Sequence, residues 1–483
     1  MSKLFRTQVR RARPGLRTLL TAVAVASLAG CSLIPTFTRP EAPVPAQWPA
    51  TAGATGAGAA STAQAAAPVA QVAWQDFFAD PALHALISTA LANNRDLRVA
   101  ALNIEQAKAQ LGIRRADQWP TLNATATGSR TPNGSGGIAD AYTAGLTVTA
   151  YELDFFGRVA SLKEQALAQF LASQEGRNAA QISLIATVAQ TWMGLLADEE
   201  LLAISRQTLS TREGSLKLVQ LRFDNGASSE LDLRQAQSLL ESARATLAQQ
   251  QRQRALDENA LVLLLGQPMP AAVRERLPAQ QLTQLRLPEL PAGLPSDLLA
   301  RRPDIRQAEQ QLVAANANIG AARAAFFPRI SLTAGAGTAS NELSALFKDG
   351  SWGFTVAPQL VLPLFDAGRN QANLAAARVG FDIAVAQYEK SIQGAFREVS
   401  DALAGRDTLD QQLQALQAQT EAETGRLRLT DLRYQNGAAS QLEWLDAQRS
   451  LYATQQALVQ VRLAYLQNQV ALYKTLGGGP DQP

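Results

Sequence analysis

Two different periods of apolar residues follow each other along the chain. Between residues 82 and 118, apolar side chains recur every three to four positions, which predicts a helix that ends at Pro120. In 121–127 and 142–150 the period changes to two, with apolar residues on one face and threonine, asparagine or glycine on the other, so both segments are predicted as strands. Residues 128–141 are rich in glycine, serine and asparagine and predict a loop between the strands.

A long helix and a shorter return helix are predicted next. After Gly157 and Arg158 the helical period continues for about 65 residues, which is roughly 100 Å at 1.5 Å per residue. Residues 182–196 carry apolar side chains at alternating spacings of three and four, the pattern of a coiled-coil seam. The predicted return helix, 229–265, is about half as long, and a proline-rich connector follows it.

The same order of elements then occurs a second time. A helix is predicted over 304–327, strands over 330–337 and 354–362, and then another long helix of about 67 residues. The segment 221–232 recurs in similar form as 432–443, an offset of 211 positions. The chain is therefore predicted to be an internal two-fold repeat.

Both copies of the recurring segment predict the tip of a helical hairpin. Asn-Gly ends one helix because glycine tolerates the left-handed backbone that follows a helix. Ser229 or Ser440 can then cap the next helix, and Asp232 or Glu443, three positions later, is expected to complete a capping box. The turn and cap residues of the two tips are Asn225, Gly226, Ser229, Asn436, Gly437 and Ser440.

The N-terminus predicts secretion and lipid attachment. A basic region without acids precedes a short apolar run, 19–26, as in a signal peptide. The run ends in Leu28-Ala29-Gly30-Cys31, which resembles a bacterial lipobox, and Cys31 is the only cysteine. A lipoprotein carrying palmitate on Cys31 is therefore predicted, with an unmodified cysteine as the alternative. Ser32 follows, which by resemblance to Gram-negative lipoproteins favours the outer membrane.

Composition argues against several function classes. Six of the 44 basic residues lie in the first 30 positions, and the remaining 38 against 41 acids give a net charge of about −3, so a nucleic-acid partner is not expected. His84 is the only histidine, and no nucleophile–base pair stands out. Neither an enzyme, a cofactor nor a metal site is therefore predicted.

The strands have the pattern of a membrane barrel, whose lipid-facing apolar positions alternate with a polar lumen. A soluble four-stranded sheet packed on a core is the alternative, and the small residues on the second face disfavour it. Four strands cannot close a barrel, and an open edge in lipid leaves backbone groups unsatisfied at several kcal/mol each. The chain is therefore expected to oligomerise, and three copies would supply twelve strands, a plausible bore. Pro358, which lacks a backbone donor, is expected at a sheet edge or a distortion.

The long helices cannot lie within a bilayer core about 30 Å thick, so they are expected to project from it. Their narrow seams favour side-by-side packing into a wall. The predicted fold class is a mixed α/β membrane protein in which four strands per chain contribute to a trimeric twelve-stranded transmembrane barrel. Long coiled-coil helices would form a periplasmic α-barrel, with a continuous tunnel as a hypothesis.

These features divide the chain into six parts. Residues 1–30 are the signal peptide, 31–73 the lipid anchor and tether, 74–266 the first repeat, 267–297 a proline-rich connector, 298–477 the second repeat, and 478–483 the tail.

Three stretches resemble the outer-membrane factor (TolC-like) family, in the lipoprotein branch (NodT-type) that serves resistance-nodulation-division efflux systems. They are Ala300-Arg301-Arg302-Pro303-Asp304-Ile305 through Pro328, then 362–369, and 432–451, and the resemblance covers about residues 74–477. It implies a homotrimeric channel in the cell outer membrane that extends into the periplasm. It also implies passive export of small molecules, coupled to an inner-membrane pump through a periplasmic adaptor (membrane fusion protein).

The candidate site is a gate at the hairpin tips. Three protomers would place Asp232, Glu443 and Asp446 as rings of carboxylates, which favour cations and form an electrostatic barrier. Asp232 and Glu443 fit simple helix caps equally well, and Asp446 also fits an ordinary solvated charge.

The resemblance implies more specific roles in this gate. Leu442 and Asp446 match the tightest constriction of the family. Arg433, Tyr434 and Arg462 match residues that hold the inner helices together in the closed state. Opening would be an iris-like movement of the second hairpin, biased by docking of the adaptor on the two tips.

Two other functions remain open. The same fold could be the outer channel of a type I protein-secretion exporter. A periplasmic adaptor or structural coiled-coil protein would carry one hairpin between compact β-domains, whereas this chain carries two hairpins, each preceded by two barrel-type strands.

Overall fold

The structure, a computed structural model, describes residues 32–45, 47–48, 72–134, 136–290 and 301–478. The signal peptide, Cys31, most of the tether and the C-terminal tail lie outside these residues. The chain divides into two compact units. Unit 1 contains residues 1–40, 105–171 and 309–387, and unit 2 contains 41–104, 172–308 and 388–483.

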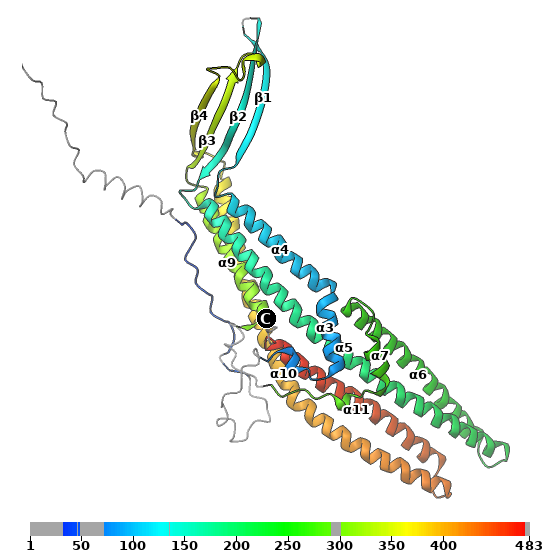
Figure 1. The fold of residues 1–483 in the computed structure, drawn as a ribbon. Coiled ribbons are helices and arrows are strands. Elements are labelled where there is room, and N and C mark those ends of the chain that lie inside the picture. The colour runs from blue at the N-terminus through cyan, green and yellow to red at the C-terminus, as the bar shows by residue number, and fades with distance from the viewer. Residues whose placement is uncertain (1–31, 46, 49–71, 135, 291–300, 479–483) are drawn as a thin grey trace, which may run out of the picture. The chain divides into compact units, whose positions relative to one another are not determined.

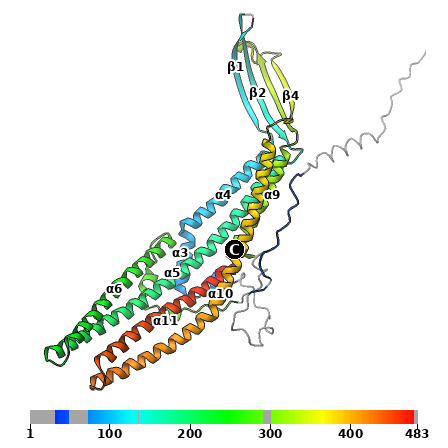
Figure 2. The same cartoon turned by 180° about the vertical axis from the view of Figure 1, so that it is seen from behind.

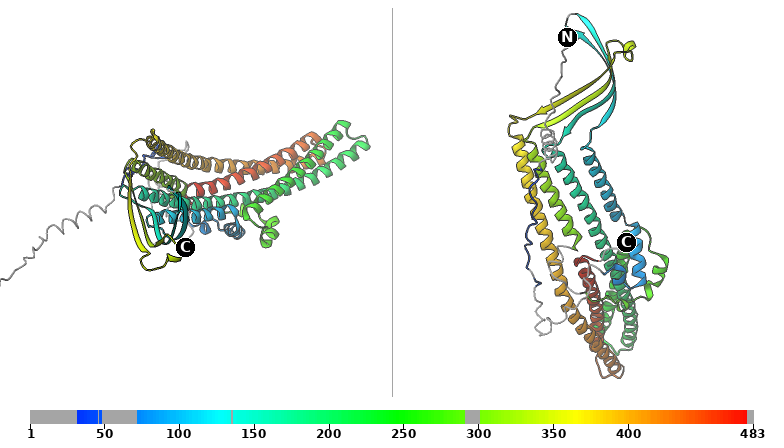
Figure 3. Two further views of the ribbon diagram at one scale, coloured as in Figure 1. Left: turned by 90° about the horizontal axis from the view of Figure 1, so that it is seen from above. Right: turned by 60° about the vertical axis from the view of Figure 1, so that its left-hand side comes forward.

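Unit 1 contains one antiparallel sheet of four strands (Figure 1). Its strands are β1 (Leu122–Asn133), β2 (Gly137–Leu153), β3 (Arg329–Ser340) and β4 (Trp352–Val361), in the spatial order of the sequence. The sheet is curved rather than flat (Figure 3). Strands β1 and β4 are its two edges, and Pro358 lies on β4, so the expected edge position of this proline is confirmed.

The prediction of a loop over 128–141 is wrong. Strands β1 and β2 continue through most of it as one hairpin, with Arg130 opposite Asp140 and Thr127 opposite Thr143. The two threonine hydroxyls are hydrogen-bonded at 2.6 Å, and Arg130 pairs with Asp140 at 3.4 Å. Composition favoured a loop, but cross-strand pairing of polar side chains stabilises a ladder that no local signal encodes.

Glycines allow an unusually close approach of β2 and β3. Gly145 is paired directly with Gly337. A Cβ atom at Gly337 would overlap the carbonyl oxygen of Ala144 and lie 2.5 Å from the Cα atom of Gly145. Only residues without a Cβ fit both positions, so the small face of these strands has a packing reason as well as a polar one.

The described part of the tether, predicted over 31–73, contacts the folded chain near its start. In unit 1, residues after Ser32 lie against α9 (Pro303–Ala324). Ile34 contacts Gly320 closely enough that a Cβ there would be 2.6 Å from the isoleucine side chain. Asn316 donates to the carbonyl of Pro35 (2.9 Å), and Arg39 pairs with Glu309. Side-chain contacts with α9, rather than tether composition, therefore determine this part of the path.

Unit 2 contains the tips of two helical hairpins (Figure 2). The first joins α5 (Arg158–Asp224) to α6 (Glu230–Leu265), and the second joins α10 (Arg369–Gln435) to α11 (Gln441–Thr475). The helices have 67 and 36 residues in the first hairpin and 67 and 35 in the second. The predicted long and short helices are thus confirmed in both halves.

Shorter elements complete the fold. The helix predicted over 82–118 is divided in two, because Asn94 ends α3 (Pro81–Asn93) and accepts from the backbone of Leu97 at the start of α4 (Arg95–Ala116). The remaining short elements of unit 2 are α2 (Trp74–Phe77), α7 (Ala271–Arg276), η2 (Leu277–Ala279) and η3 (Leu282–Gln284), and unit 1 contains η4 (Leu343–Ala345).

In the core of unit 2, α2 packs against the end of α11. Phe77 stacks on Tyr473 with ring centroids 4.4 Å apart, and both side chains are fully buried. In the same unit, the buried guanidinium of Arg302 donates to Asp304, Glu398 and the carbonyl oxygen of Thr475. This arginine joins the start of α9 to α10 and to the end of α11.

Candidate gate at the hairpin tips

The tip of the second hairpin is a standard helix end followed by a standard helix start. Gly437 has a φ of 73°, and its backbone N–H and that of Ala438 donate to carbonyls of the last turn of α10 at 3.1 and 2.8 Å. These are the two hydrogen bonds of a Schellman motif. Ser440 then caps α11 by accepting from the backbone of Glu443 (3.2 Å).

The first tip repeats this geometry, and its predicted capping box is confirmed. Gly226 has a φ of 70°. Ser229 accepts from the backbone of Asp232, and the backbone of Ser229 donates to the Asp232 carboxylate. The Ser229 hydroxyl donates to the same carboxylate at 2.7 Å, and this hydrogen bond lowers the pKa of Asp232.

The capping box predicted at the second tip forms only one of its two hydrogen bonds, so half of that prediction is wrong. Ser440 caps as expected, but the Glu443 carboxylate does not return to the backbone of Ser440. It lies 4.0 Å from the guanidinium of Arg433 instead. Glutamate is one methylene longer than aspartate and can reach this neighbouring charge, which the sequence spacing alone does not reveal.

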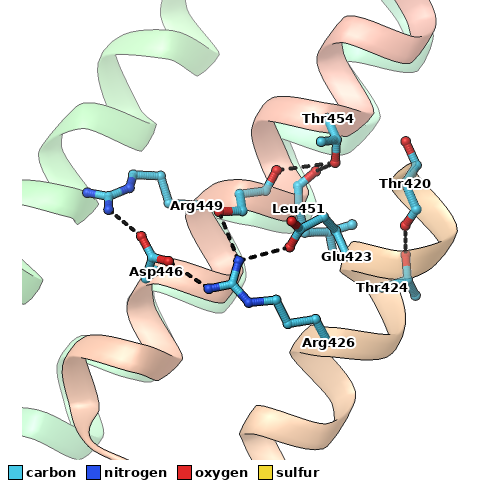
Figure 4. Close-up of polar contacts among 9 residues, drawn as sticks. Thr420, Glu423, Thr424, Arg426, Asp446, Arg449, Leu451 and Thr454 are labelled. Atoms are coloured by element: carbon cyan, nitrogen blue, oxygen red, sulfur yellow. Dashed lines mark hydrogen bonds and ion pairs between the residues drawn. The ribbon is translucent and has the colours of Figure 1, made fainter. Parts of the chain in front are cut away.

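Asp446 is the centre of a group of charges that joins α10 to α11 (Figure 4). Its carboxylate accepts from Arg426 on α10 at 2.7 Å and from Arg449 on its own helix at 2.5 Å. Arg426 also pairs with Glu423 at 3.2 Å. We refer to Glu423, Arg426, Asp446 and Arg449 as the tip network. The hydrogen bond from Arg426, followed by that from Arg449, holds the pKa of Asp446 below its usual range.

A separate set of contacts, around Tyr434, joins the second hairpin to the first. Tyr434 is buried and stacks on Trp444, with ring centroids 4.7 Å apart and planes 9° apart. Arg222 of the first hairpin donates to the Tyr434 hydroxyl at 2.8 Å, and its guanidinium carbon lies 4.7 Å from the centre of the ring. Burial raises the pKa of Tyr434, so the hydroxyl stays neutral and accepts the hydrogen bond from Arg222.

The remaining predicted gate residues lie in different surroundings. Leu442, one turn before Asp446 on α11, is 61% exposed. Arg433 donates to the carbonyl of Ala438 across the turn (2.9 Å). Arg462 lies 16 residues beyond Asp446 on α11, roughly 24 Å along the helix, so it is not part of the tip network.

Five residues of this region were missed from the sequence: Arg222, Glu423, Arg426, Trp444 and Arg449. Arg426 and Asp446 lie ten positions before and after Asn436, the centre of the turn, so hairpin symmetry could have paired them. Arg222 is the counterpart of Arg433 in the first repeat. No local signal shows that it contacts the other hairpin. Among the residues that the structure describes, no group of three or more His, Cys, Asp or Glu side chains could hold a metal ion.

Comparison with known proteins gives these features a context. The model of the outer membrane efflux protein family matches residues 86–267 and 294–478. The probable efflux pump outer membrane protein TtgC of Pseudomonas putida is 48% identical over 468 residues, which is 95% of each chain. The outer membrane protein OprJ of Pseudomonas aeruginosa is 44% identical over 97% of this chain and 96% of its own.

Solved structures agree with this similarity. A membrane protein from Pseudomonas aeruginosa has a TM-score of 0.84 and 43% identity and covers 93% of this chain and 98% of its own. The open state of the MtrE outer membrane channel of Neisseria gonorrhoeae has a TM-score of 0.83 at 41% identity and covers 93% of this chain and 98% of its own. The predicted fold class, location and channel function are confirmed. The chain is an exit channel of the bacterial outer membrane, built as a trimer, and it belongs to the outer membrane efflux protein family.

Proposed function

We propose that the hairpin tips form the periplasmic gate of this channel and that the tip network keeps the gate closed. The observation that carries the proposal is the Asp446 carboxylate, which pairs with Arg426 on α10 and with Arg449 on α11. Around a three-fold axis, three copies of Asp446 and of the exposed Leu442 would narrow the opening. The contact of Arg222 with Tyr434 would keep the second hairpin against the first.

Removal of the Asp446 carboxylate is expected to open the gate. In Asp446→Ala, Arg426 and Arg449 lose their shared acid while Glu423 stays paired with Arg426, so each protomer keeps one uncompensated positive charge and three such charges around the axis repel one another. We expect the single-channel conductance of the purified trimer in a planar bilayer to rise about three-fold or more.

The matched control for this experiment is Asp401→Ala. Asp401 is an exposed acid on α10 that forms a weak pair with Arg397 at 3.9 Å, and it is distant from the tip in sequence. Its conductance should equal that of the wild type. An unchanged conductance in Asp446→Ala, with the trimer correctly inserted, would contradict the proposed gate.

The gate is also expected to open at low pH. Because the folded-state pKa of Asp446 is lowered from 3.8, its contribution to the closed state is complete above pH 3.8 and is lost as the pH falls through the lower folded value. Conductance should therefore stay constant from about pH 7 to about pH 5 and rise towards about pH 3. The conductance of Asp446→Asn, which cannot titrate at this position, should lack that rise. An equal rise in both proteins would assign the acid response to other carboxylates.

The two tips are the proposed docking surface for the periplasmic adaptor of a tripartite system with an inner-membrane pump. Asn225, Gly226, Asn436 and Gly437 lie in exposed turns, where small residues allow the close approach of a partner.

Lipid attachment at Cys31 is proposed as well, and the docking of residues 33–39 on α9 supports it because it directs the tether along unit 1. No catalytic or cofactor role is proposed.

Small organic molecules are the proposed cargo. The relatives include an antibiotic efflux pump outer membrane protein, ArpC, and a toluene efflux pump outer membrane protein, TtgC, each 48% identical to this chain over 468 residues. These names favour the efflux of small molecules over the alternative of protein secretion. The two repeats, 74–266 and 298–477, are proposed to contribute equivalent hairpins to the channel wall.

A further inference from the structure

A buried arginine without a counter-ion lies in the seam between the two hairpins. Arg212 on α5 is only 5% exposed. Its Nη1 donates to the Oε1 of Gln448 on α11 at 2.8 Å, and Gln448 is buried as well. Within the part of the chain that the structure describes, no carboxylate lies within ion-pair distance of Arg212. Burial lowers the pKa of Arg212, and the charge of nearby Arg449 lowers it further.

Polar contacts extend on both sides of Arg212 along the same seam. Further from the tip, the hydroxyls of Ser205 and Tyr452 lie 3.1 Å apart. Nearer the tip, Arg222 contacts Tyr434. Ser205, seven residues before Arg212, is buried and also faces α11, so Arg212 occupies a core position of the α5–α11 pairing where an apolar residue is usual.

The burial of Arg212 raises the free energy of the state in which the two hairpins are packed together, which we call the closed seam. A buried charge loses its hydration, and one neutral amide acceptor only partly replaces it. When the hairpins separate, water reaches the guanidinium and this cost disappears. The Gln448 contact acts in the opposite direction, since it is made only in the closed seam.

We propose that Arg212 makes the closed state of the channel marginal, so that separation of the hairpins is favoured by hydration of its buried, unpaired guanidinium. The contact of Arg222 with Tyr434 opposes separation of the hairpins near the tip, and Arg212 favours it further along the seam. Modest adaptor contacts would then suffice to shift the equilibrium, because a partner supplies only its differential affinity for the two states. This inference rests on the proposed gate and assigns a positioning role to a residue that touches no cargo.

Two chemically independent variants test the inference. Arg212→Met combined with Gln448→Met removes the charge and its acceptor together while keeping side-chain length, so no buried group is left unpaired. Gln448→Glu instead supplies the missing counter-ion. Arg206→Met, an exposed arginine on the same helix, is the matched control. The full-length trimer is used in all experiments.

Amide hydrogen exchange and single-channel recording give separate readouts. Both test variants are expected to slow exchange in residues 205–216 and to lower open probability, each by about ten-fold, whereas Arg206→Met should match the wild type. If the double methionine variant fails to fold, exchange will be faster in the whole of α5. Gln448→Glu, which changes only the charge of one side chain, then decides the result.

Exchange that is unchanged or faster in both variants would overturn the inference, since the Arg212–Gln448 hydrogen bond would then stabilise the closed seam. Slower exchange with unchanged open probability would also overturn it, because the seam would not control opening. Asp446→Ala, measured in parallel, reports on the gate itself. If that variant alone leaves conductance unchanged, the gate proposal fails, whereas the exchange data still decide whether Arg212 strains the seam.

Discussion

Gly337→Ala is expected to reduce the amount of folded trimer in the outer membrane several-fold. The added methyl group would overlap the carbonyl oxygen of Ala144 and lie 2.5 Å from the Cα atom of Gly145. Both obstacles are backbone atoms of β2, so no side-chain rotation relieves them, and the two strands must move apart. Overpacking of this kind costs about 3 kcal/mol in each protomer. The measurement is the yield of heat-modifiable trimer in outer-membrane fractions.

Gly335 provides a matched control on the same strand and the same face. A Cβ atom there would meet only ordinary contacts, 3.5 Å from a methyl group of Thr147 and 3.7 Å from the carbonyl oxygen of Leu146. Gly335→Ala should therefore give a yield close to that of the wild type. If both variants assemble equally well, β2 and β3 do not need the close approach at Gly337, and the prediction is wrong.

Arg302→Ala is expected to lower the stability of unit 2 by about 3 kcal/mol, near the lower end of the cost of breaking a buried ion pair. The side chain of Arg302 is only 8% exposed, and it donates to Asp304, Glu398 and the carbonyl oxygen of Thr475. Its removal leaves a buried carbonyl without a donor. The two acids are 42% exposed and can regain water, which limits the loss.

The stability change is to be measured as a shift of the denaturation midpoint in urea for the purified trimer. Arg302→Lys should fall between wild type and Arg302→Ala, because a lysine keeps the charge but cannot form the paired hydrogen bonds to Asp304. Arg397→Ala is the control, since Arg397 is 77% exposed and its pair with Asp401 should contribute about 1 kcal/mol or less. Equal midpoints for Arg302→Ala and Arg397→Ala would show that the buried arginine does not stabilise unit 2.

The hairpin tips combine opposing electrostatic effects within a short length of helix. In the proposed gate, Asp446 cancels the repulsion of Arg426 and Arg449 and keeps α10 and α11 together. In the seam between the two hairpins, no acid among the described residues pairs with Arg212. A closed state built in this way is stable without a partner yet close in free energy to the open one, as a channel opened by docking requires.

Features that depend on neighbours along the chain were determined by the sequence itself. The hairpin tips, their glycines and serine caps involve residues only a few positions apart, so local chemistry defines them. The lengths of the long and short helices follow from the apolar period and its interruptions. Because the chain is repeated, each of these features could be predicted in both halves. The edge position of Pro358 follows from its missing backbone donor.

Features that depend on contacts across elements were decided only by the tertiary structure. The strands through 128–141 are formed by pairing of β1 with β2, which composition concealed. Glu443 faces Arg433 rather than the backbone of Ser440, and Arg222 meets Tyr434 across 212 positions of sequence. The buried position of Arg212 also requires knowledge of which helices pack on it. Sequence spacing defines the face of a helix on which a side chain lies, whereas the packing of distant helices decides its partner and its access to water.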